Sequence, residues 1–267
     1  MFTNRTAKTI IAGLIVLMVL ICLFWNTKPN EKTDQAMGTW VRIVGDKAEV
    51  GIIEIKRLDK LLSKFDSNSE ISLMNKGQGP ACRSGRVKGS RDTREVLELA
   101  EEVKRLSHGA FDITMGKGRQ IDLGGIAKGY AVGKAREKMR LAGVKRAMID
   151  MHSSIAVIGD GWRVGVSGIG NQILEVVELN DGEALSTSGQ YEQPGHILDP
   201  RTGKPADKCL SVTVIAKDAG LADALSTAVF VLGPVEGMKL IKSIKNVKVI
   251  ILDRKGKIYA NFGSKLR

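Results

Sequence analysis

A carboxylate and a hydroxyl are spaced so that both could bind one metal ion. Asp223 and Thr227 are four residues apart within the apolar segment 221–232. If this segment is a helix, the two side chains lie on one face of it. Their oxygens are the ligands that a hard cation such as Mg²⁺ requires. The spacing therefore indicates a candidate magnesium site, with a simple helix-capping role for Asp223 as the alternative.

A glycine-rich turn precedes a second expected helix. The run 121–130 reads IDLGGIAKGY and places Asp122 just before a helix expected over 126–141. Glycine lets the backbone approach a phosphate closely, and the amino-terminal end of a helix attracts anions. The run matches neither G-x-G-x-x-G nor a P-loop. It is either a ligand-binding segment or a strand-to-helix turn with a close helix crossing.

One histidine is a candidate general base. His196 is one of three histidines and begins the turn-forming run HILDPRTG. An imidazole titrates near neutral pH, which suits proton abstraction. Asp199 and Arg201 could orient the ring or set its pKa. The alternative is a histidine with only a structural role.

A second turn offers an aromatic ring and a carboxylate. The run GAFD at 109–112 follows an expected helix, so it either presents Phe111 and Asp112 to a ligand or only ends that helix.

The chain contains no C-x-x-C, H-E-x-x-H or G-x-S-x-G motif. Their absence argues against a zinc site, a metalloprotease and an α/β-hydrolase.

The composition is that of a globular protein with an excess of basic residues. The 267 residues are 43% hydrophobic, which is enough to bury a core, and the formal net charge is +12. This charge favours an anionic partner, either a dinucleotide or a membrane surface. Nucleic acid is not expected, because the basic residues are dispersed and no recognition motif is present.

The amino-terminal segment has the pattern of a membrane anchor. Arg5 and Lys8 precede an uncharged run over 9–25, which spans roughly 25 Å as a helix. The preceding positive charges favour export of the chain beyond this run. We expect a signal anchor over 1–26, a polar tether over 27–36 and one domain over 37–267. Lipidation at Cys22 is the alternative, although Ile21 occupies a position where a small residue is expected.

Hydrophobic periodicity and turn residues predict the elements that position these segments. Helices are expected after Asp46, after a capping box formed by Asp92 and Glu95, and over 126–141, 221–232 and 235–244. Short strands are expected over 146–151, 155–158, 162–166, 173–179, 211–216, 247–252 and 257–261. Helices and strands occur in blocks, so the predicted class is α+β.

In this order, the segments resemble the ApbE family of FAD:protein FMN transferases. The matching runs are MGT (37–39), FDSNSEIS (65–72) with Asn75, GAFD (109–112), DLGGIAKGY (122–130), TSG (187–189), HILDP (196–200) and ADALST (222–227). They extend over essentially everything after the expected anchor. The resemblance implies one compact domain with a mainly antiparallel, T-fold-like sheet, exported on the outer side of a bacterial inner membrane.

The resemblance also implies a reaction. Members of this family bind FAD with Mg²⁺, cleave its pyrophosphate and join FMN to a Thr or Ser hydroxyl of a target protein, releasing AMP. Targets include flavoprotein subunits of membrane redox complexes. Some members hydrolyse FAD to FMN and AMP, so an FAD pyrophosphatase is one alternative. A non-catalytic flavin-binding membrane protein is another.

Roles carried over from the family fall on particular residues of this chain. Asp223, Thr227 and the backbone carbonyl of Gly125 would hold the metal, and His196 would deprotonate the target hydroxyl. The expected FAD site consists of Met37, Phe65, Ala110, Phe111, Asp112, Asp122, Lys128, His196 and Ile197.

The chain departs from the family pattern at one place. Relatives usually carry a Gly-Gly pair after the strand that ends at Asp150, whereas this chain has Ser153 and Ser154 after His152. We expect the serine side chains to crowd a backbone that glycine leaves open. His152 would be either a second polar contact or a surface residue.

Overall fold

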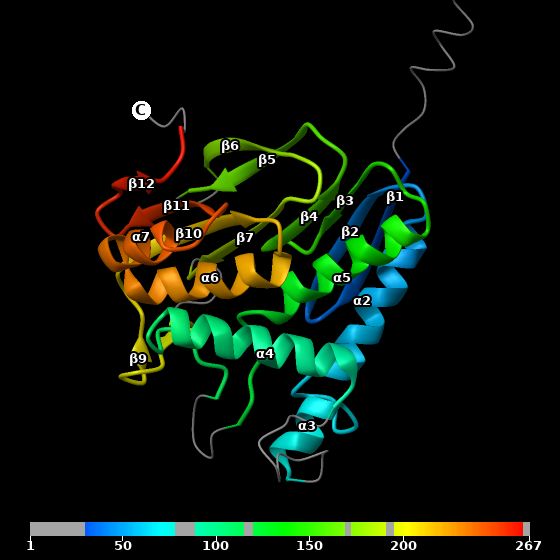
Figure 1. Cartoon of the computed structure of the whole chain (residues 1–267), viewed down its shortest axis with the longest axis horizontal. Coiled ribbons are helices and arrows are strands. Elements are labelled where there is room, and N and C mark those ends of the chain that lie inside the picture. Colours follow the sequence, from blue (N-terminus) through cyan, green and yellow to red (C-terminus); the bar gives the residue numbers. More distant parts are fainter. Residues whose placement is uncertain (1–29, 78–88, 115–119, 169–171, 191–194, 264–267) are drawn as a thin grey trace, which may run out of the picture.

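One antiparallel sheet organises the part of the chain that the computed structural model describes, residues 30–77, 89–114, 120–168, 172–190 and 195–263 (Figure 1). The sheet has eight strands in the order β1-β2-β3-β4-β7-β10-β11-β12. Their bounds are β1 (Glu31–Ala36), β2 (Thr39–Gly45), β3 (Ala147–Asp150), β4 (Ser154–Ile158), β7 (Ala184–Gly189), β10 (Cys209–Ala216), β11 (Lys248–Asp253) and β12 (Ile258–Ala260). The predicted α+β class with a mainly antiparallel sheet is confirmed.

Helices cover one face of this sheet. They are α2 (Ala48–Leu62), α3 (Glu70–Asn75), α4 (Arg91–Leu106), α5 (Ala127–Leu141), α6 (Ala219–Leu232) and α7 (Pro234–Lys242). Figure 1 shows α5 and α6 lying along the sheet, with α4 outside them as a further layer. The main hydrophobic core lies between the helices and the sheet, and α6 is almost entirely buried within it.

A two-stranded ribbon covers the opposite face. It consists of β5 (Trp162–Ser167) and β6 (Ile173–Leu179), which alternate buried and exposed residues. Val164 and Leu179 of the ribbon pack against Ile155 of β4 and Ile215 of β10 in a second, smaller core. Because strand side chains alternate in direction, β4, β7 and β10 present one set of residues to the ribbon and the other set to the helices.

The expected tether over 27–36 is wrong in its second half. Residues 31–36 form β1, which pairs along its whole length with β2 and so begins the domain before residue 37. This strand lacks an apolar alternation because it lies at the edge of the sheet, where most of its side chains meet solvent. Its charged residues instead pair with neighbours, as in Lys32–Glu49 and Lys56–Asp34.

Two predicted helix starts also need correction. Asp46 does not cap α2, whose amino-terminal flanking residue is Lys47 in the left-handed conformation at φ 54°. For α4, the cap is the Ser90 hydroxyl, which accepts the Thr93 backbone N–H, rather than a box formed by Asp92 and Glu95. The helices beginning at 127 and 219 lie within two residues of their predicted starts.

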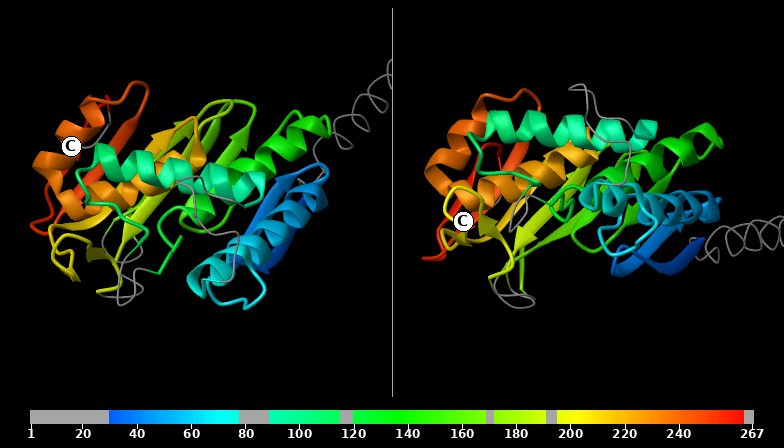
Figure 2. Two further views of the ribbon diagram at one scale, coloured as in Figure 1. Left: turned by 60° about the horizontal axis from the view of Figure 1, so that its bottom comes forward. Right: turned by 90° about the horizontal axis from the view of Figure 1, so that it is seen from below.

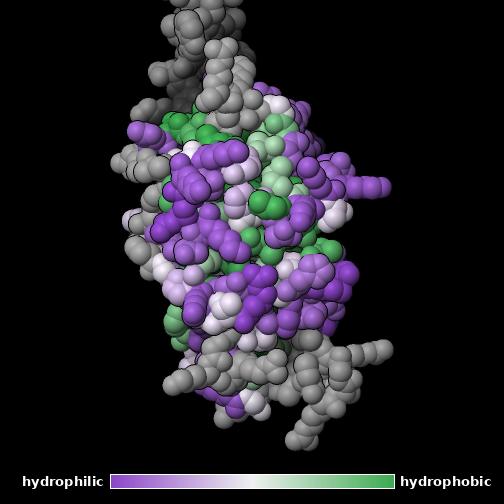
Figure 3. All heavy atoms as spheres, turned by 90° about the vertical axis from the view of Figure 1, so that its left-hand side faces the viewer, coloured by the Kyte–Doolittle hydropathy of each residue, from purple (hydrophilic) through white to green (hydrophobic). Residues whose placement is uncertain are grey.

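The expected membrane segment over 1–26 lies outside the described residues. Among the helices that the structure describes, none has the length and apolarity needed to cross a bilayer. The face seen in Figure 3, on the side of α7 and β12, is mostly hydrophilic, with small and separated hydrophobic areas. Lys239 and Lys242 of α7 and Lys255 in the turn between β11 and β12 are exposed.

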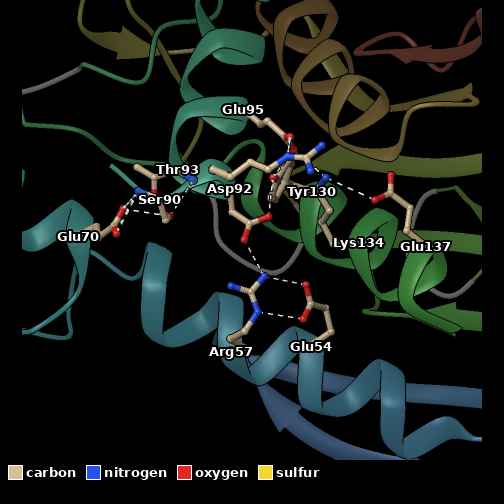
Figure 4. A network of polar contacts seen from close by, with 11 residues as sticks. Glu54, Arg57, Glu70, Ser90, Asp92, Thr93, Glu95, Tyr130, Lys134 and Glu137 are labelled. Carbon is tan, nitrogen blue, oxygen red and sulfur yellow. Dashed lines mark hydrogen bonds and ion pairs between the residues drawn. The ribbon is translucent and has the colours of Figure 1, made fainter. Parts of the chain in front are cut away.

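A polar network joins α2, α4 and α5 (Figure 4). Arg57 of α2 forms two hydrogen bonds to the buried Glu54, at 2.9 and 2.7 Å, and one of 2.7 Å to Asp92 of α4. The Tyr130 hydroxyl of α5 lies 3.0 Å from both Asp92 and Glu95. Since these charges are matched across three helices, the network fixes the position of α5 relative to α2 and α4.

The network also fixes the charge states of its members. Hydrogen bonds from Lys134 and Arg91 lower the pKa of Glu95 to about 2, so this carboxylate stays ionised at neutral pH. Burial, together with the Asp92 charge, raises the pKa of the Tyr130 phenol, which therefore stays protonated and donates.

Helices α5 and α6 cross with almost no space between them at Gly129. A Cβ atom added there would lie 2.3 Å from the Ala219 carbonyl oxygen and 2.4 Å from Asp223 Cβ. Only glycine allows this approach. At Gly133, one turn later on the same helix, an added Cβ would lie 3.3 Å from Ala219 Cβ. A small shift of Ala219 would be enough to accommodate it.

We expect Gly129→Ala to lower the free energy of unfolding by about 1–3 kcal/mol or more, because the backbones must separate. Gly133→Ala is the matched control and should stay within about 1 kcal/mol of wild type, since gained helix propensity offsets the tighter contact. Urea denaturation of the full chain in detergent measures both values. Equal stability of the two variants would show that the crossing is not tight.

Candidate functional site

Small hydroxyl side chains interrupt the apolar face of the sheet beneath α6. Ser154 of β4 and Ser186 of β7 are directly paired, and both are buried. The Ser186 hydroxyl donates to the Ser154 hydroxyl at 2.9 Å. Ser188, two residues along β7, lies on the same face. These serines form a polar floor where the neighbouring positions, Ala156 and Ala184, belong to the main core.

The facing side of α6 supplies the proposed metal-binding side chains. Ser188 Oγ lies 2.7 Å from Ser226 Oγ and 3.1 Å from Thr227 Oγ1. Asp223, one turn earlier on α6, is 4% exposed. Asp223 and Thr227 therefore lie together above the polar floor, as their spacing predicts.

The glycine turn before α5 closes this group of residues. The Gly129 backbone N–H donates to Asp223 Oδ2 at 2.8 Å. A Cβ atom added at Gly125 would lie 3.1 Å from Thr227 Oγ1 and 3.1 Å from the Phe111 ring. The structure thus brings Gly125, Phe111, Asp223 and Thr227 together from three separate parts of the chain.

The Asp223 carboxylate is an acid buried in the protein interior. Burial raises the pKa of Asp223, whereas the Lys128 ammonium, the Gly129 N–H and the Ser154 hydroxyl act in the opposite direction. A buried carboxylate keeps its charge only where positive charge or donors compensate it. The positive end of α5 and Lys128 supply part of that compensation, and a bound cation would supply more.

The donor set fits magnesium. The carboxylate of Asp223, the hydroxyl of Thr227 and the backbone of Gly125 offer oxygen ligands, and Mg²⁺ characteristically binds one or two carboxylates together with water or substrate phosphates. Among the described residues there is no cluster of three or more His, Cys, Asp or Glu side chains able to hold a metal.

The expected flavin-binding residues divide between a buried wall and an exposed rim. Ala110, Phe111 and Ile197 are buried and form part of the wall. Phe65 is 87% exposed, with the Lys64 ammonium 5.0 Å from its ring centroid. Lys64 also forms an ion pair of 2.5 Å with Asp122. This ion pair places the segment that carries Phe65 next to the glycine turn.

Two of the expected flavin-binding residues, Asp112 and Met37, are held in place by other residues of the protein. Asp112 pairs with Lys104 at 2.9 Å. Burial acts to raise its pKa, but hydrogen bonds from Thr114 and Lys104 hold the pKa of Asp112 below its ordinary value. Met37 is in the left-handed conformation at φ 50°, and its N–H donates to Asp59 of α2 at 2.9 Å. Met37 therefore lies at the end of α2 that leads to Phe65.

A glutamine holds the segment that carries His196. Gln190 Nε2 donates to the carbonyls of Ile197 and Ala206, at 3.2 and 2.8 Å, and its Oε1 accepts the Gly195 N–H at 3.1 Å. Gln190 directly follows β7, two residues after Ser188. The exposed His196 is thus anchored at the end of β7 that also carries the polar floor.

The same segment lies against the turn after α4. It continues through the hairpin β8 (Leu198–Asp199) and β9 (Lys204–Pro205), which lies beside the end of α4 in both views of Figure 2. A Cβ atom added at Gly109 would lie 3.8 Å from Arg201 Cγ. Arg201 pairs with Asp199 at 2.7 Å, and this hydrogen bond lowers the pKa of the Asp199 carboxyl.

Sequence reasoning did not assign a role to Ser154, Ser186, Ser188 or Gln190. The signal for the serines was present, because small polar residues at alternate positions of a strand mark one face of it. The Ser154 side chain is buried and accepts a hydrogen bond from the Ser186 hydroxyl. His152 is exposed, and its N–H donates to Asp150 at the turn between β3 and β4.

Comparison with known proteins agrees with this arrangement. The ApbE family model matches residues 37–120 and 116–251, which together include most of the chain. The chain belongs to the ApbE family. The resemblance read from the sequence is therefore confirmed.

Individual members of the family match more distantly. A FAD:protein FMN transferase of Rhodobacter capsulatus is 32% identical over 154 residues, which is 53% of this chain and 29% of the relative. One from Klebsiella pneumoniae (strain 342) is 32% identical over 162 residues, 56% of this chain and 51% of the relative. The matched region thus spans about half, or less, of the length of these relatives.

Solved structures match over most of the chain. The ApbE protein of Thermotoga maritima has a TM-score of 0.75 at 28% identity and covers 87% of this chain and 96% of its own. The flavin transferase ApbE of Vibrio cholerae has a TM-score of 0.76 at 23% identity, covering 87% and 97%. These ApbE proteins therefore share the fold of this chain.

We expect Gln190→Ala to free the His196 segment. Losing three hydrogen bonds should lower the free energy of unfolding by about 1–3 kcal/mol and speed amide hydrogen exchange at Gly195 and Ala206. Gln35→Ala, on the exposed edge strand β1, is the control and should change neither value. Unchanged exchange at Gly195 would show that Gln190 does not hold this segment.

Proposed function

We propose that the protein transfers the FMN half of FAD to a Thr or Ser hydroxyl of a target flavoprotein, with Mg²⁺, and releases AMP. Membership in the ApbE family supports this activity. The observation that carries it is the placement of the buried Asp223 and of Thr227 against Gly125 of the glycine turn and Gly129 of α5. One acid with neighbouring oxygen donors, beside the amino-terminal end of a helix, suits a cation bound to a diphosphate.

The metal and the protein would share the work of charge neutralisation. Mg²⁺ held by Asp223, Thr227 and the Gly125 carbonyl would neutralise negative charge on the diphosphate. Lys128 and the N–H groups at the start of α5 would add fixed positive potential on the same side. Because phosphoryl transfer depends mainly on positioning and on charge neutralisation, these groups supply most of what the reaction requires.

His196 is the proposed general base. Its imidazole would take the proton from the target hydroxyl while that oxygen attacks the phosphorus of the FMN half. The bond between this phosphorus and the bridging oxygen breaks, and its electron pair leaves with AMP. The buried Ala110, Phe111 and Ile197 would exclude water from one side, and Met37, Phe65, Asp112 and Asp122 would contact the flavin nucleotide nearer the rim.

Two other functions use the same residues differently. If water replaced the target hydroxyl, the protein would be a Mg²⁺-dependent FAD pyrophosphatase. If no reaction occurred, it would be a flavin-binding membrane protein. We favour transfer because the relatives found by sequence are FAD:protein FMN transferases.

We also propose where the reaction takes place. Arg5 and Lys8 followed by an uncharged run favour an anchor over 1–26 in a bacterial inner membrane, with the catalytic domain on the extracytoplasmic side. The catalytic domain would then meet an acceptor subunit of a membrane redox complex on the extracytoplasmic side of that membrane. The positive net charge would help to attract the anionic FAD.

The three functions give different products. We expect the full chain, incubated with FAD, Mg²⁺ and a candidate acceptor, to add FMN to an acceptor Thr or Ser, as detected by mass spectrometry. Asp223→Ala should give no adduct, because the cation loses its charged ligand. Free FMN without an adduct would instead indicate hydrolysis, and FAD that is bound but unchanged would indicate a carrier.

We expect His196→Ala to slow transfer by about 10²- to 10⁴-fold while the Kd for FAD changes little, because a general base acts on the acceptor proton. Single-turnover rates and fluorescence titration with FAD separate the two effects. The control is His108→Asn, since His108 is exposed at φ 52° and Asn tolerates this conformation. Loss of FAD binding with normal chemistry in the bound enzyme would exclude the role as base.

A further inference from the structure

We propose that Ser188 of β7 is a positioning residue, which accepts the proton of the Thr227 hydroxyl and so leaves the oxygen of that hydroxyl to the cation. This role rests on the proposed function, because the cation is the one that Asp223 and Thr227 would hold. Ser188 itself would not touch the metal.

Three hydroxyl groups form a short chain of contacts between β7 and α6. Ser188 Oγ lies 2.7 Å from Ser226 Oγ and 3.1 Å from Thr227 Oγ1. Ser226 Oγ in turn lies 2.8 Å from the backbone carbonyl oxygen of Asp223, one turn earlier on the same helix. Because Ser188 and Ser226 are buried, these hydroxyls satisfy one another rather than water.

The direction of each hydrogen bond in this chain follows from the number of protons. A carbonyl oxygen can only accept, so the Ser226 hydroxyl donates its one proton to Asp223. The contact between Ser226 and Ser188 then uses the proton of Ser188. Since Ser188 has no second proton, its contact with Thr227 uses the proton of Thr227. The Thr227 hydroxyl is therefore the donor to Ser188.

This direction leaves the lone pairs of Thr227 Oγ1 available to a cation. A hydroxyl binds a metal through its oxygen, so its proton has to be donated to another group. Thr227 Oγ1 also lies close to the glycine turn, because a Cβ atom added at Gly125 would be 3.1 Å from it. The backbone carbonyl of Gly125 is another of the proposed ligands. The oxygen that donates to Ser188 thus faces the segment expected to share the metal.

The sheet rather than the helix supplies the acceptor for Thr227. A helical threonine can donate to the carbonyl four residues earlier, which here is that of Asp223. In this structure that carbonyl accepts the Ser226 hydroxyl, and Thr227 lies against Ser188 instead. Ser188 is held by its pairing with Val212 of β10. An acceptor fixed in this way limits the orientations of the Thr227 hydroxyl.

Binding of Mn²⁺ alone to the full chain in detergent tests this role. Electron paramagnetic resonance measures the free Mn²⁺ and so gives the Kd without FAD or turnover. We expect Ser188→Ala to raise this Kd by about 10- to 100-fold, because Thr227 loses the partner that orients it. A Ser188→Ala chain with wild-type Mn²⁺ affinity would overturn the inference.

A double-mutant cycle shows whether Ser188 acts through Thr227. Thr227→Val removes the metal-binding oxygen and keeps the shape of the side chain, so it should raise the Kd by itself. Adding Ser188→Ala to Thr227→Val should raise the Kd by no more than about twofold further, because no hydroxyl is left to orient. If the effects of the two changes multiply instead, Ser188 acts on the metal by another route and the inference is wrong.

Thr213→Val is the matched control. Thr213 of β10 is also buried, and its hydroxyl shares a hydrogen bond of 2.8 Å with Thr187 of β7. Since strand side chains alternate, this pair lies on the same face as Leu185 and Ile215, which pack toward the ribbon. Thr213→Val should bind Mn²⁺ as the wild type does. Equal weakening in Thr213→Val and Ser188→Ala would show a general effect of losing a buried hydroxyl and would contradict a specific role.

Activity supplies a readout that a purely structural role would not reproduce. For Ser188→Ala the Mg²⁺ concentration giving half-maximal transfer should rise by a factor similar to that of the Kd. Its kcat at saturating Mg²⁺ should return to near the wild-type value, because the ligands themselves remain. Thermal unfolding in EDTA checks that the variant is folded.

Asp223→Ala separates the role of Ser188 from the proposed function. If Asp223→Ala loses Mn²⁺ binding but Ser188→Ala does not, the metal site stands and the role of Ser188 is wrong. If Asp223→Ala binds Mn²⁺ normally, or the wild-type chain binds none, the metal site itself is wrong and the role of Ser188 fails with it.

Discussion

The buried charge of Asp223 is the constraint on which the rest of the site depends. A carboxylate taken out of water is costly unless donors or cations surround it. Here the compensation comes from two neighbours of α6: Lys128 and the Gly129 N–H of α5, and Ser154 of the sheet, each of which acts to lower the pKa of Asp223. Each of these groups reaches Asp223 only because α5, α6 and β4 pack closely. The local chemistry therefore requires the whole α+β arrangement.

The close contact between α5 and α6 explains several features of the sequence together. Gly129 allows the two backbones to meet, and Gly125 leaves space between Phe111 and Thr227. The network through Arg57, Asp92 and Tyr130 fixes α5 from its other side. Exposed ion pairs contribute little to stability, but a network anchored on the buried Glu54 and Tyr130 specifies how the helices are positioned. The glycine turn before α5 is thereby held against α6.

The sequence predicted long periodic elements better than short or polar ones. The bounds of α5, α6 and β6 lie within two residues of the predicted ones. The strand β1 was expected as tether, since an edge strand held by main-chain pairing and by pairs such as Lys32–Glu49 needs no apolar alternation. At the site, the shared helix face of Asp223 and Thr227 was predictable, because they are one helical turn apart. The buried pair of Ser154 and Ser186 was not, because it depends on the register between β4 and β7.

In the proposed reaction, a cation at Asp223 and Thr227 and the imidazole of His196 act on one diphosphate. A crystal structure of the chain with FAD and Mn²⁺, with the metal located by its anomalous scattering, tests it most directly. We expect a metal peak about 2.1 Å from oxygens of Asp223, Thr227 and Gly125, with the diphosphate between that metal and His196. A metal bound away from Asp223, or a diphosphate that lies out of reach of His196, would show that the two groups do not share a reaction centre.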